Sequence, residues 1–562
     1  MTNSRKYYSH FALILVFIAG SLLIAGLLLP PLPVFITDNG NKYIIMRDFA
    51  ETGTLFIDHI EPALFPRGGF HFQTLADGAV YSFHSWVLPA ISALFYRIAG
   101  ENGALLPVWL SGLAILLLLG NDRKSRLTAW GLLLTTPVWL YSQMLWEMVP
   151  SALAVLAASI LLKKRHFFGA GLILGLGIWF REELYILSAV IVVLMLISRR
   201  WHDVRLLTAG GITGVLPLWL CNFFIYGHIL GLHGETYALN NRTEFALLSE
   251  IQGLFFNFYQ HLLRFETLAP GPSLALSIIG TAALFLPGFF KNRILKIAGL
   301  TVFTLIDLIF IGYLFQDGCD PAADTRLFLC GVTMSLFFTL PPAAGFFLNL
   351  RQLWNDRNQH IRFMTRSVTI FIFAVPPLLT RFDIGLTFGA RHYICIMPLL
   401  MLLSFRGFAR MQIPVRIKQF FIIVLCTGGI ILQCWGFTTL YRSSHCSAAL
   451  EEQLAASPET TVVTDVFFLP EQSPRIFFDK SCLELTNEKQ LKILLDHLKQ
   501  NKIDNFILIL AQDNNFRRMS NEVLGKLLMF YPPVRQPETI LAAPGMPLFI
   551  VHCRRAVQQA AR

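Results

Sequence analysis

A few acidic and basic residues lie at the ends of long apolar runs, where they could do chemistry at a membrane boundary. Asp38 follows the first apolar run by a few residues, and Glu147 lies between two further runs in "YSQMLWEMVPSAL". Arg391 and His392 begin the stretch "RHYICIMPLL". A partly buried carboxylate can act as a general base, and an arginine can bind a phosphate through two parallel hydrogen bonds. These residue types therefore indicate a base and an anion-binding site.

Each of these residues also has a purely structural explanation. Asp38 stands in Thr-Asp-Asn-Gly, which is favourable sequence for a turn. Glu147 precedes a predicted helix, whose dipole favours an acidic residue at that end. Arg391 could instead reach the phosphate groups of membrane lipids. The sequence leaves both explanations open for all three residues.

Two further groups complete the set of candidates. Weaker candidates for binding the same anion lie in the segment after Asp38: Lys42, Arg47, Arg67 and His84. The charged run at 181–183, Arg-Glu-Glu, lies between short apolar segments. We expect this run to form an ion-pair cluster that neutralises its own charge.

The composition indicates that lipid surrounds most of the chain. Of 562 residues, 54% are hydrophobic and 14% are charged, whereas soluble proteins have about 25% charged residues. The net charge of +11 is spread over short clusters between apolar runs, which argues against nucleic acid as a partner and is typical of oriented membrane helices. Nine cysteines without a CxxC pair argue against a zinc site.

We expect about 13 transmembrane helices, because each span needs about 20 mostly apolar residues. The candidate spans are 11–29, 103–120, 128–144, 149–162, 167–180, 184–198, 206–225, 272–290, 296–315, 327–349, 367–380, 390–405 and 418–436. With a cytoplasmic N-terminus, every connection predicted to be inside carries basic residues. The interrupted apolar stretch 82–100 would invert that pattern if it crossed, so we expect a re-entrant or interfacial helix there.

The chain changes character near residue 440. Alternating apolar residues predict strands at 461–469, 475–479, 505–511 and 547–553, and helical spacing predicts helices at 486–501 and 520–531. A short amphipathic helix is also predicted at 46–53, in the long segment 30–102. The fold class is therefore an all-α polytopic membrane protein (residues 1–436) with a small extracytoplasmic α/β domain (residues 440–562). We expect it in the plasma membrane, which is the inner membrane in a bacterium.

Three apolar motifs, in addition to Asp38 and Glu147, resemble a known family: "GLILGLGIWFREEL", "PLWLCNFFIYGHILG" and "FGARHYICIMPLL". In their order and topology, residues 1–436 resemble the GT-C superfamily of membrane glycosyltransferases. By layout, the chain is similar to the protein O-mannosyltransferases and to the bacterial transferase that adds aminoarabinose to lipid A. The resemblance implies a polyprenyl-phosphate sugar as donor, with a glycan, a lipid or a protein as acceptor.

The resemblance also implies roles for particular residues. Asp38 resembles the catalytic aspartate of the first loop, and Glu147 resembles the second acidic position. Arg391 resembles a basic residue near the phosphate of the lipid-linked donor. From the residues themselves, His392 and Lys42 are further candidates for binding this phosphate, and we expect single displacement with inversion. The sequence requires no cofactor, although two carboxylates could bind a divalent metal.

Three alternatives remain open. A transporter or flippase of lipid-linked sugars would carry charged residues near the middle of the membrane and an internal repeat of spans. A polysaccharide polymerase or ligase of another membrane fold would also bind polyprenyl-linked sugars. A non-catalytic scaffold is the third, because Asn39 follows Asp38 where many relatives have a second acidic residue.

Overall fold

The structure, a computed structural model, forms two compact units that each draw on distant parts of the chain. It describes residues 4–27, 38–57, 72–75, 78–120, 123–232, 255, 258, 262–263, 270–290, 292–317, 335–378, 390–466, 469–512, 519–543 and 546–556. The first unit, here called the helical unit, comprises Met1–Ile24 and Leu105–Thr438. The second, here called the mixed unit, comprises Ala25–Ala104 and Thr439–Arg562.

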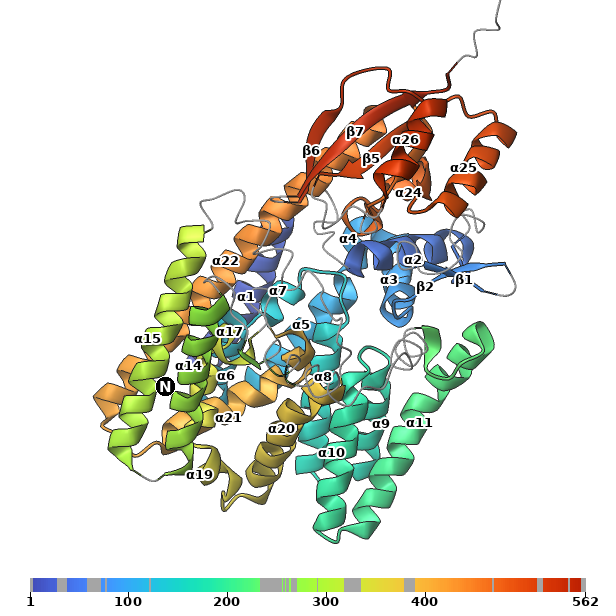
Figure 1. The fold of residues 1–562 in the computed structure, drawn as a ribbon. Coiled ribbons are helices and arrows are strands. Elements are labelled where there is room, and N and C mark those ends of the chain that lie inside the picture. The colour runs from blue at the N-terminus through green and yellow to red at the C-terminus, as the bar shows by residue number, and fades with distance from the viewer. Residues whose placement is uncertain are drawn as a thin grey trace, which may run out of the picture. The chain divides into compact units, whose positions relative to one another are not determined.

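The described part of the helical unit consists of helices (Figure 1). Its elements before residue 230 are α1 (Ser4–Leu27), α5 (Leu106–Gly120), α6 (Arg123–Thr135), α7 (Val138–Tyr141), α8 (Met148–Lys163), α9 (Phe167–Ile178), α10 (Glu183–Ile197) and α11 (Trp201–Tyr226). The later ones are α14 (Pro270–Phe289), α15 (Arg293–Asp317), α17 (Leu336–Thr339), η4 (Pro341–Ala343), α18 (Ala344–Phe347), α19 (Leu350–Trp354), α20 (Gln359–Leu378), η5 (Arg391–Ile396), α21 (Met397–Arg410) and α22 (Val415–Ala456).

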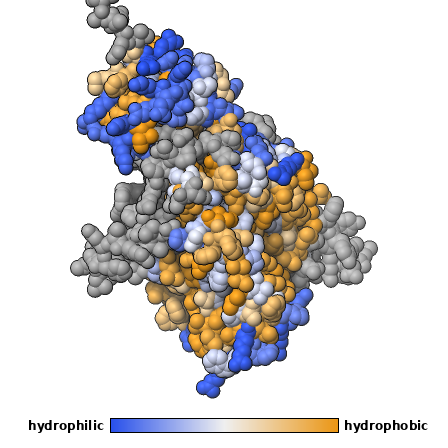
Figure 2. All heavy atoms as spheres, turned by 90° about the vertical axis from the view of Figure 1, so that its right-hand side faces the viewer, coloured by the Kyte–Doolittle hydropathy of each residue, from blue (hydrophilic) through white to orange (hydrophobic). Residues whose placement is uncertain are grey.

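The chain is a mostly helical, multi-span membrane protein. Within the described ranges, seven helical segments are long and apolar enough to cross a membrane, and five shorter helices are also apolar. Figure 2 shows hydrophobic residues covering much of the face that it draws. Large apolar side chains such as Phe224 and Ile197 are exposed. A surface of this kind is stable in lipid rather than in water. The total of 13 spans stays a prediction.

Two predicted spans differ from the helices found. The segment 327–349 is described from Ser335 onwards, and there it consists of the short elements α17, η4 and α18. Pro341 and Pro342 interrupt the helix because proline lacks the N–H that a continuous helix uses. The last span, predicted at 418–436, is part of the 42-residue helix α22. It continues because neither proline nor glycine occurs between Phe437 and Ser457.

The mixed unit begins with elements from the first loop. They are α2 (Asp38–Thr52), the antiparallel strands β1 (Phe72–Thr74) and β2 (Val80–Ser82), α3 (Val87–Ala99) and α4 (Glu101–Ala104). The helix predicted at 46–53 is the second half of α2, which begins earlier than expected. In the stretch 82–100, α3 has 13 residues. Its placement along the membrane surface stays a prediction.

The C-terminal part of the mixed unit is a five-stranded sheet with the order β4-β3-β5-β7-β6. Parallel pairing joins β3 (Thr461–Thr464) to β4 (Ser481–Glu484) and β5 (Asn505–Ala511). Antiparallel pairing joins β5 to β7 (Met546–Arg554), and β7 to β6 (Glu538–Ala543). The helices α25 (Glu488–Gln500) and α26 (Asn521–Phe530) match the predicted ones. Asn487 and Ser520 cap them by accepting backbone N–H bonds.

One predicted strand of this domain is wrong. The segment 475–479 contains the short helix α24 (Ile476–Asp479), and β4 starts only after it. Its buried residues, Ile476 and Phe477, are consecutive, whereas the two faces of a strand would alternate. Pro474 precedes the helix, where a missing N–H costs no helical hydrogen bond.

Glycines hold α9 and α11 against each other along their length. Gly171 and Gly175 of α9 face Gly210 and Gly214 of α11, so both helices carry glycine at a spacing of four residues. A Cβ atom on Gly171 would collide with the carbonyl oxygen of Leu207. Small residues at this spacing let the backbones of membrane helices approach closely. This pair fixes the C-terminal end of α9, from which the chain enters the candidate site.

We expect Gly171→Ala to destabilise the protein by about 1–3 kcal/mol, because the added methyl group must push two backbones apart. The free energy of unfolding, measured in detergent micelles with a denaturant, reports the loss. Gly211→Ala is the matched control, since its methyl group would lie 3.8 Å from the nearest atom, an ordinary contact. Equal stability of the two variants would contradict the close packing described here.

Candidate active site

Arg181 lies at the centre of a buried charged cluster in the helical unit. The chain leaves α9 through Trp179, whose Nε1–H donates to the carbonyl oxygen of Gly214 on α11 at 2.8 Å. The backbone N–H of Arg181 donates to Gly177 at 3.2 Å. These bonds fix the turn between α9 and α10, and they therefore fix the backbone position from which the Arg181 side chain extends.

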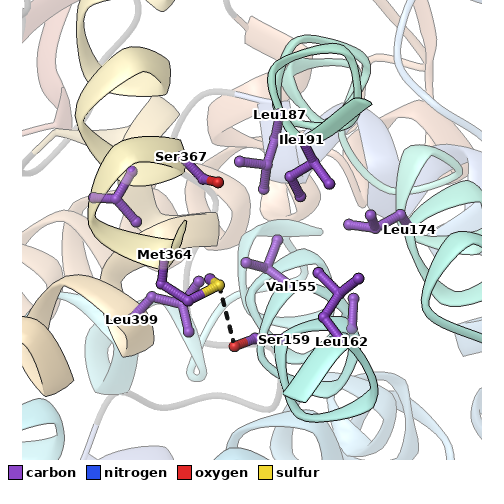
Figure 3. Close-up of a pocket in the computed structure, with 11 residues that line it drawn as sticks. Val155, Ser159, Leu162, Leu174, Leu187, Ile191, Met364, Ser367 and Leu399 are labelled. Atoms are coloured by element: carbon purple, nitrogen blue, oxygen red, sulfur yellow. Dashed lines mark hydrogen bonds between the residues drawn. The ribbon is translucent and has the colours of Figure 1, made fainter. Parts of the chain in front are cut away.

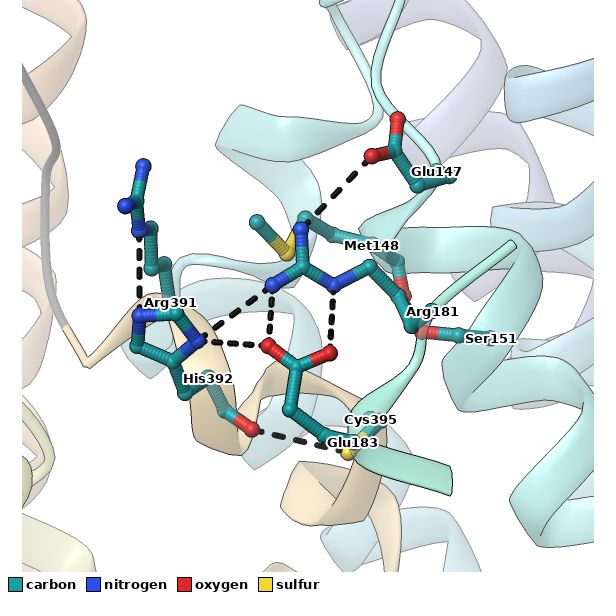
Figure 4. Close-up of polar contacts among 8 residues, drawn as sticks. All are labelled: Glu147, Met148, Ser151, Arg181, Glu183, Arg391, His392 and Cys395. Carbon is teal, nitrogen blue, oxygen red and sulfur yellow. Dashed lines mark hydrogen bonds and ion pairs between the residues drawn. The ribbon is translucent and has the colours of Figure 1, made fainter. Parts of the chain in front are cut away.

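The guanidinium of Arg181 pairs with two carboxylates (Figure 4). Its Nε donates to Glu183 Oε2 at 2.9 Å, and its Nη2 also donates to Glu183. Its Nη1 lies 3.6 Å from Glu147 Oε1. The ion pair expected within 181–183 is therefore present, and it extends to Glu147 at the start of α8. The contact of Arg181 with Glu147 is longer than its contact with Glu183 and involves one nitrogen.

The segment that begins with Arg391 supplies the other side of the cluster. The Nδ1 atom of His392 lies 2.5 Å from Glu183 Oε1, and Arg391 Nε donates to His392 Nε2 at 3.2 Å. These contacts fit an imidazole whose Nδ1–H donates to the carboxylate while Nε2 accepts. In Figure 4 the terminal nitrogens of Arg391 point away from Glu183. His392 thus connects Arg391 to the Arg181 pair.

The members of the cluster are withdrawn from solvent. The exposed fractions are 6% for Glu147 and Glu183, 7% for Arg391 and 4% for His392. Burying a charge without a partner costs several kcal/mol, so charges at such sites are paired. Two carboxylates and two guanidinium groups balance here. A phosphate that entered beside Arg391 would meet a positive group already held in place by neighbouring side chains.

The structure brings three of the five predicted site residues together, and all three belong to the helical unit: Glu147, Arg391 and His392. Asp38 begins α2 in the mixed unit, and its side chain lies outside the described part. Lys42 is on the same helix and is 1% exposed. Arg67, one of the weaker candidates, falls outside the described residues.

Arg181 and Glu183 pair with each other as expected, and they also link Glu147 and His392 into one cluster. The signal in the sequence was three consecutive charges between apolar segments. Nothing local showed that their partners would come from residues 147 and 392. Within the described ranges, no three His, Cys, Asp or Glu side chains gather in a metal-binding group, and Arg181 supplies the positive charge between Glu147 and Glu183.

Figure 3 shows a small apolar cavity in the same unit, whose lining includes no residue of this cluster. Its lining comes from α8, α9, α10, α20 and α21 and includes Val155, Ser159, Leu174, Leu187, Met364 and Leu399. The hydroxyl of Ser159 contacts the sulfur of Met364 at 3.6 Å. No charged residue lines the cavity, so it lacks the groups that would bind a phosphate.

We expect Glu183→Gln to destabilise the protein by about 3 kcal/mol, because it leaves the half-buried Arg181 without its closest negative charge. Unfolding by denaturant in detergent micelles measures the change. Glu182→Gln is the control: Glu182 is exposed, and its substitution should alter stability by no more than about 0.5 kcal/mol. A Glu183→Gln variant as stable as this control would show that the cluster is not held by charge.

Solved structures provide the comparisons with known proteins, since no family model and no curated protein matches the chain. The chain is similar to ArnT from Cupriavidus metallidurans bound to undecaprenyl phosphate, with a TM-score of 0.48 and 12% identity, over 98% of this chain and 99% of that chain. ArnT from Cupriavidus metallidurans in the apo state matches with a TM-score of 0.42 and 13% identity, over 96% of this chain and 97% of that chain.

The chain is also similar to the archaeal oligosaccharyltransferase AglB from Archaeoglobus fulgidus, in complex with an inhibitory peptide and a dolichol-phosphate. Here the TM-score is 0.47 and the identity is 10%, over 90% of this chain and 69% of that chain. ArnT and AglB are thus solved structures that this chain resembles over nearly its whole length.

Proposed function

We propose that this protein is a glycosyltransferase that moves a sugar from a polyprenyl-phosphate donor to an acceptor hydroxyl at the outer face of the membrane, with inversion. The observation that supports this most strongly is the buried cluster around Arg181, in which Arg391 is held with its terminal nitrogens directed away from the paired carboxylates. Such an arrangement suits a lipid-linked phosphate.

In the proposed reaction, the acceptor oxygen forms a bond to the anomeric carbon while the bond from that carbon to the phosphate oxygen breaks. The bonding electrons leave with the phosphate, whose negative charge increases. Arg391 stabilises this charge, and a fixed donor in a water-poor site stabilises it more than water would. His392 and Glu183 hold Arg391 in place. Lys42 is proposed as a second positive group for the phosphate.

The proton of the acceptor hydroxyl passes to Asp38, the proposed general base. General-base assistance contributes about 10²–10⁴-fold to the rate. Glu147, whose Oε1 lies 3.6 Å from Arg181 Nη1, is proposed to orient the acceptor hydroxyl.

The proposed orientation has a cytoplasmic N-terminus and an extracytoplasmic C-terminal domain, in the plasma membrane or the inner membrane of a bacterium. It rests on the basic residues in the connections predicted to be inside. Arg357, an exposed residue between α19 and α20, belongs to one of these connections. A cysteine placed at this position in intact cells should resist a membrane-impermeant thiol reagent, and reaction with the reagent would contradict the orientation.

Binding of undecaprenyl phosphate to the purified protein tests the phosphate site. We expect Arg391→Gln to weaken binding at least tenfold, because it removes a charged, bidentate donor. Arg357→Gln is the control, because Arg357 lies at the surface. Native mass spectrometry or a fluorescent analogue of undecaprenyl phosphate would report the affinity. Equal affinity of both variants would remove Arg391 from the site.

A sugar-transfer assay tests whether Asp38 is the general base. Its donors are synthetic undecaprenyl-phosphate hexoses and pentoses, each labelled in the sugar. We expect Asp38→Asn to lower the rate about 10²–10⁴-fold while the protein still binds undecaprenyl phosphate. Asp203→Asn on α11 is the control, because Asp203 pairs with the exposed Arg200. An Asp38→Asn variant that transfers sugar at the normal rate would remove this assignment.

One residue favours the transporter as a second candidate. Asp307 lies in the middle of α15, is 2% exposed, and among the described residues its Oδ1 has no hydrogen-bond partner. Ionisable groups deep in membrane segments often mark transport pathways. Under the proposed function, Asp307→Asn should leave sugar transfer within about twofold of the original rate. Loss of lipid-linked sugar movement across vesicles, with transfer unaffected, would favour the transporter.

A further inference from the structure

Arg475 of the C-terminal domain contacts acidic residues from two distant parts of the mixed unit. Its Nε and Nη2 donate to the two carboxylate oxygens of Glu101 at 3.0 and 2.9 Å. Its Nη1 donates to Glu451 at 2.7 Å, and its backbone N–H donates to the other oxygen of the same carboxylate at 3.0 Å. One side chain therefore joins α4, the end of α22 and the start of α24.

The contact continues from Glu101 to α2. The hydroxyl of Tyr43 donates to Glu101 Oε1 at 2.6 Å, and the Tyr43 side chain is 1% exposed. Phe478 of α24 packs edge-on against the Tyr43 ring, with centroids 6.4 Å apart. The guanidinium of Arg47, one turn further along α2, lies 4.0 Å from the centre of the Phe478 ring. Two separate contacts thus connect α2 to the C-terminal domain.

Arg475 and Tyr43 keep their protonation states over a wide pH range. Burial acts to lower the pKa of Arg475, but its hydrogen bonds to Glu101 and the charge of Glu451 outweigh burial and hold that pKa above its ordinary value. Burial, together with the neighbouring Glu101, raises the pKa of the Tyr43 hydroxyl. Tyr43 therefore remains a donor, and the bidentate Arg475 pair is of the geometrically specific kind.

We propose that Arg475 is a positioning residue for α2, acting through Glu101 and Tyr43, so that the C-terminal domain holds in place the helix that begins with Asp38. The inference rests on the proposed function, because it gives the C-terminal domain a part in the reaction only if Asp38 is the base. It assigns Arg475 no contact with substrate. The distances support it: each link from Arg475 to Tyr43 is 3.0 Å or shorter.

A pair on an exposed surface would not have this effect, since such pairs contribute about 0–1 kcal/mol. The side chains of Arg475, Glu101 and Glu451 are 22%, 16% and 9% exposed. They are hydrogen-bonded to one another at several atoms rather than at one. Removing Arg475 would leave two carboxylates facing each other without the cation between them.

Hydrogen exchange of the full-length protein in lipid nanodiscs tests the link without an activity assay. We expect Arg475→Ala to speed the exchange of the backbone amides at 43–52 at least tenfold, with β5 unchanged. Tyr43→Phe removes only the hydroxyl and should give a smaller increase in the same peptide, and Arg475→Lys should restore part of the protection. Arg555→Ala, which removes an exposed arginine that pairs with Asp504 at 3.5 Å, is the matched control.

Two results of this experiment would overturn the proposal. One is unchanged exchange at 43–52 in Arg475→Ala. The other is equal acceleration in β5, because that would show a general loosening of the domain rather than release of α2.

Sugar transfer and lipid binding separate this inference from the proposed function. We expect Arg475→Ala to lower the transfer rate from the labelled undecaprenyl-phosphate sugars about tenfold while binding of undecaprenyl phosphate stays unchanged. If Asp38→Asn has no effect on transfer but Arg475→Ala still releases α2, the link stands and Asp38 is not the base. If Asp38→Asn lowers transfer and Arg475→Ala does not, the positioning role fails while the proposed function stands.

Discussion

The candidate site depends on pairing the charge of Arg181 inside a region of apolar helices. A lone guanidinium there would cost several kcal/mol, and so would each carboxylate without a partner. Glu183 contacts it at two atoms, and Glu147 completes the arrangement at 3.6 Å. Because the charges stabilise one another, the chain can hold Arg391 in a nearly dry environment. The glycine contacts of α9 and α11 determine where this pairing occurs.

Much of the fold follows from local patterns that the sequence displays. Alternation of apolar residues is clear in β5 and β7, and helical spacing is clear in α25, so these elements lie where they were predicted. The segment 475–479 was wrongly predicted to be a strand, because aromatic residues are common in strands. It is a short helix in which two consecutive side chains are buried. The edge strand β6 was not predicted from the apolar pattern, because residues such as Leu541 remain exposed.

The arrangement of the site was less accessible from sequence. Glu147 and Arg391 were recognised as ionisable residues at the ends of apolar runs, a property that a single sequence displays. The bridging by Arg181 depends on contacts between residues 147, 183 and 392, which are distant in the chain. Pairing at such separations depends on tertiary packing, and periodicity carries no information about it. For the same reason the association of Tyr43 and Glu101 with Arg475 had no counterpart in the predicted domains.

The mixed unit is built from two distant parts of the chain, and this has a consequence for biosynthesis. Residues 25–104 leave the ribosome long before residues 439–562, which complete their unit. At about 5–20 residues per second, the intervening segment takes some tens of seconds to translate. Throughout that interval the Glu101 carboxylate lacks Arg475, and the Tyr43 ring lacks Phe478. The first part of the mixed unit is therefore made well before the residues that complete its packing.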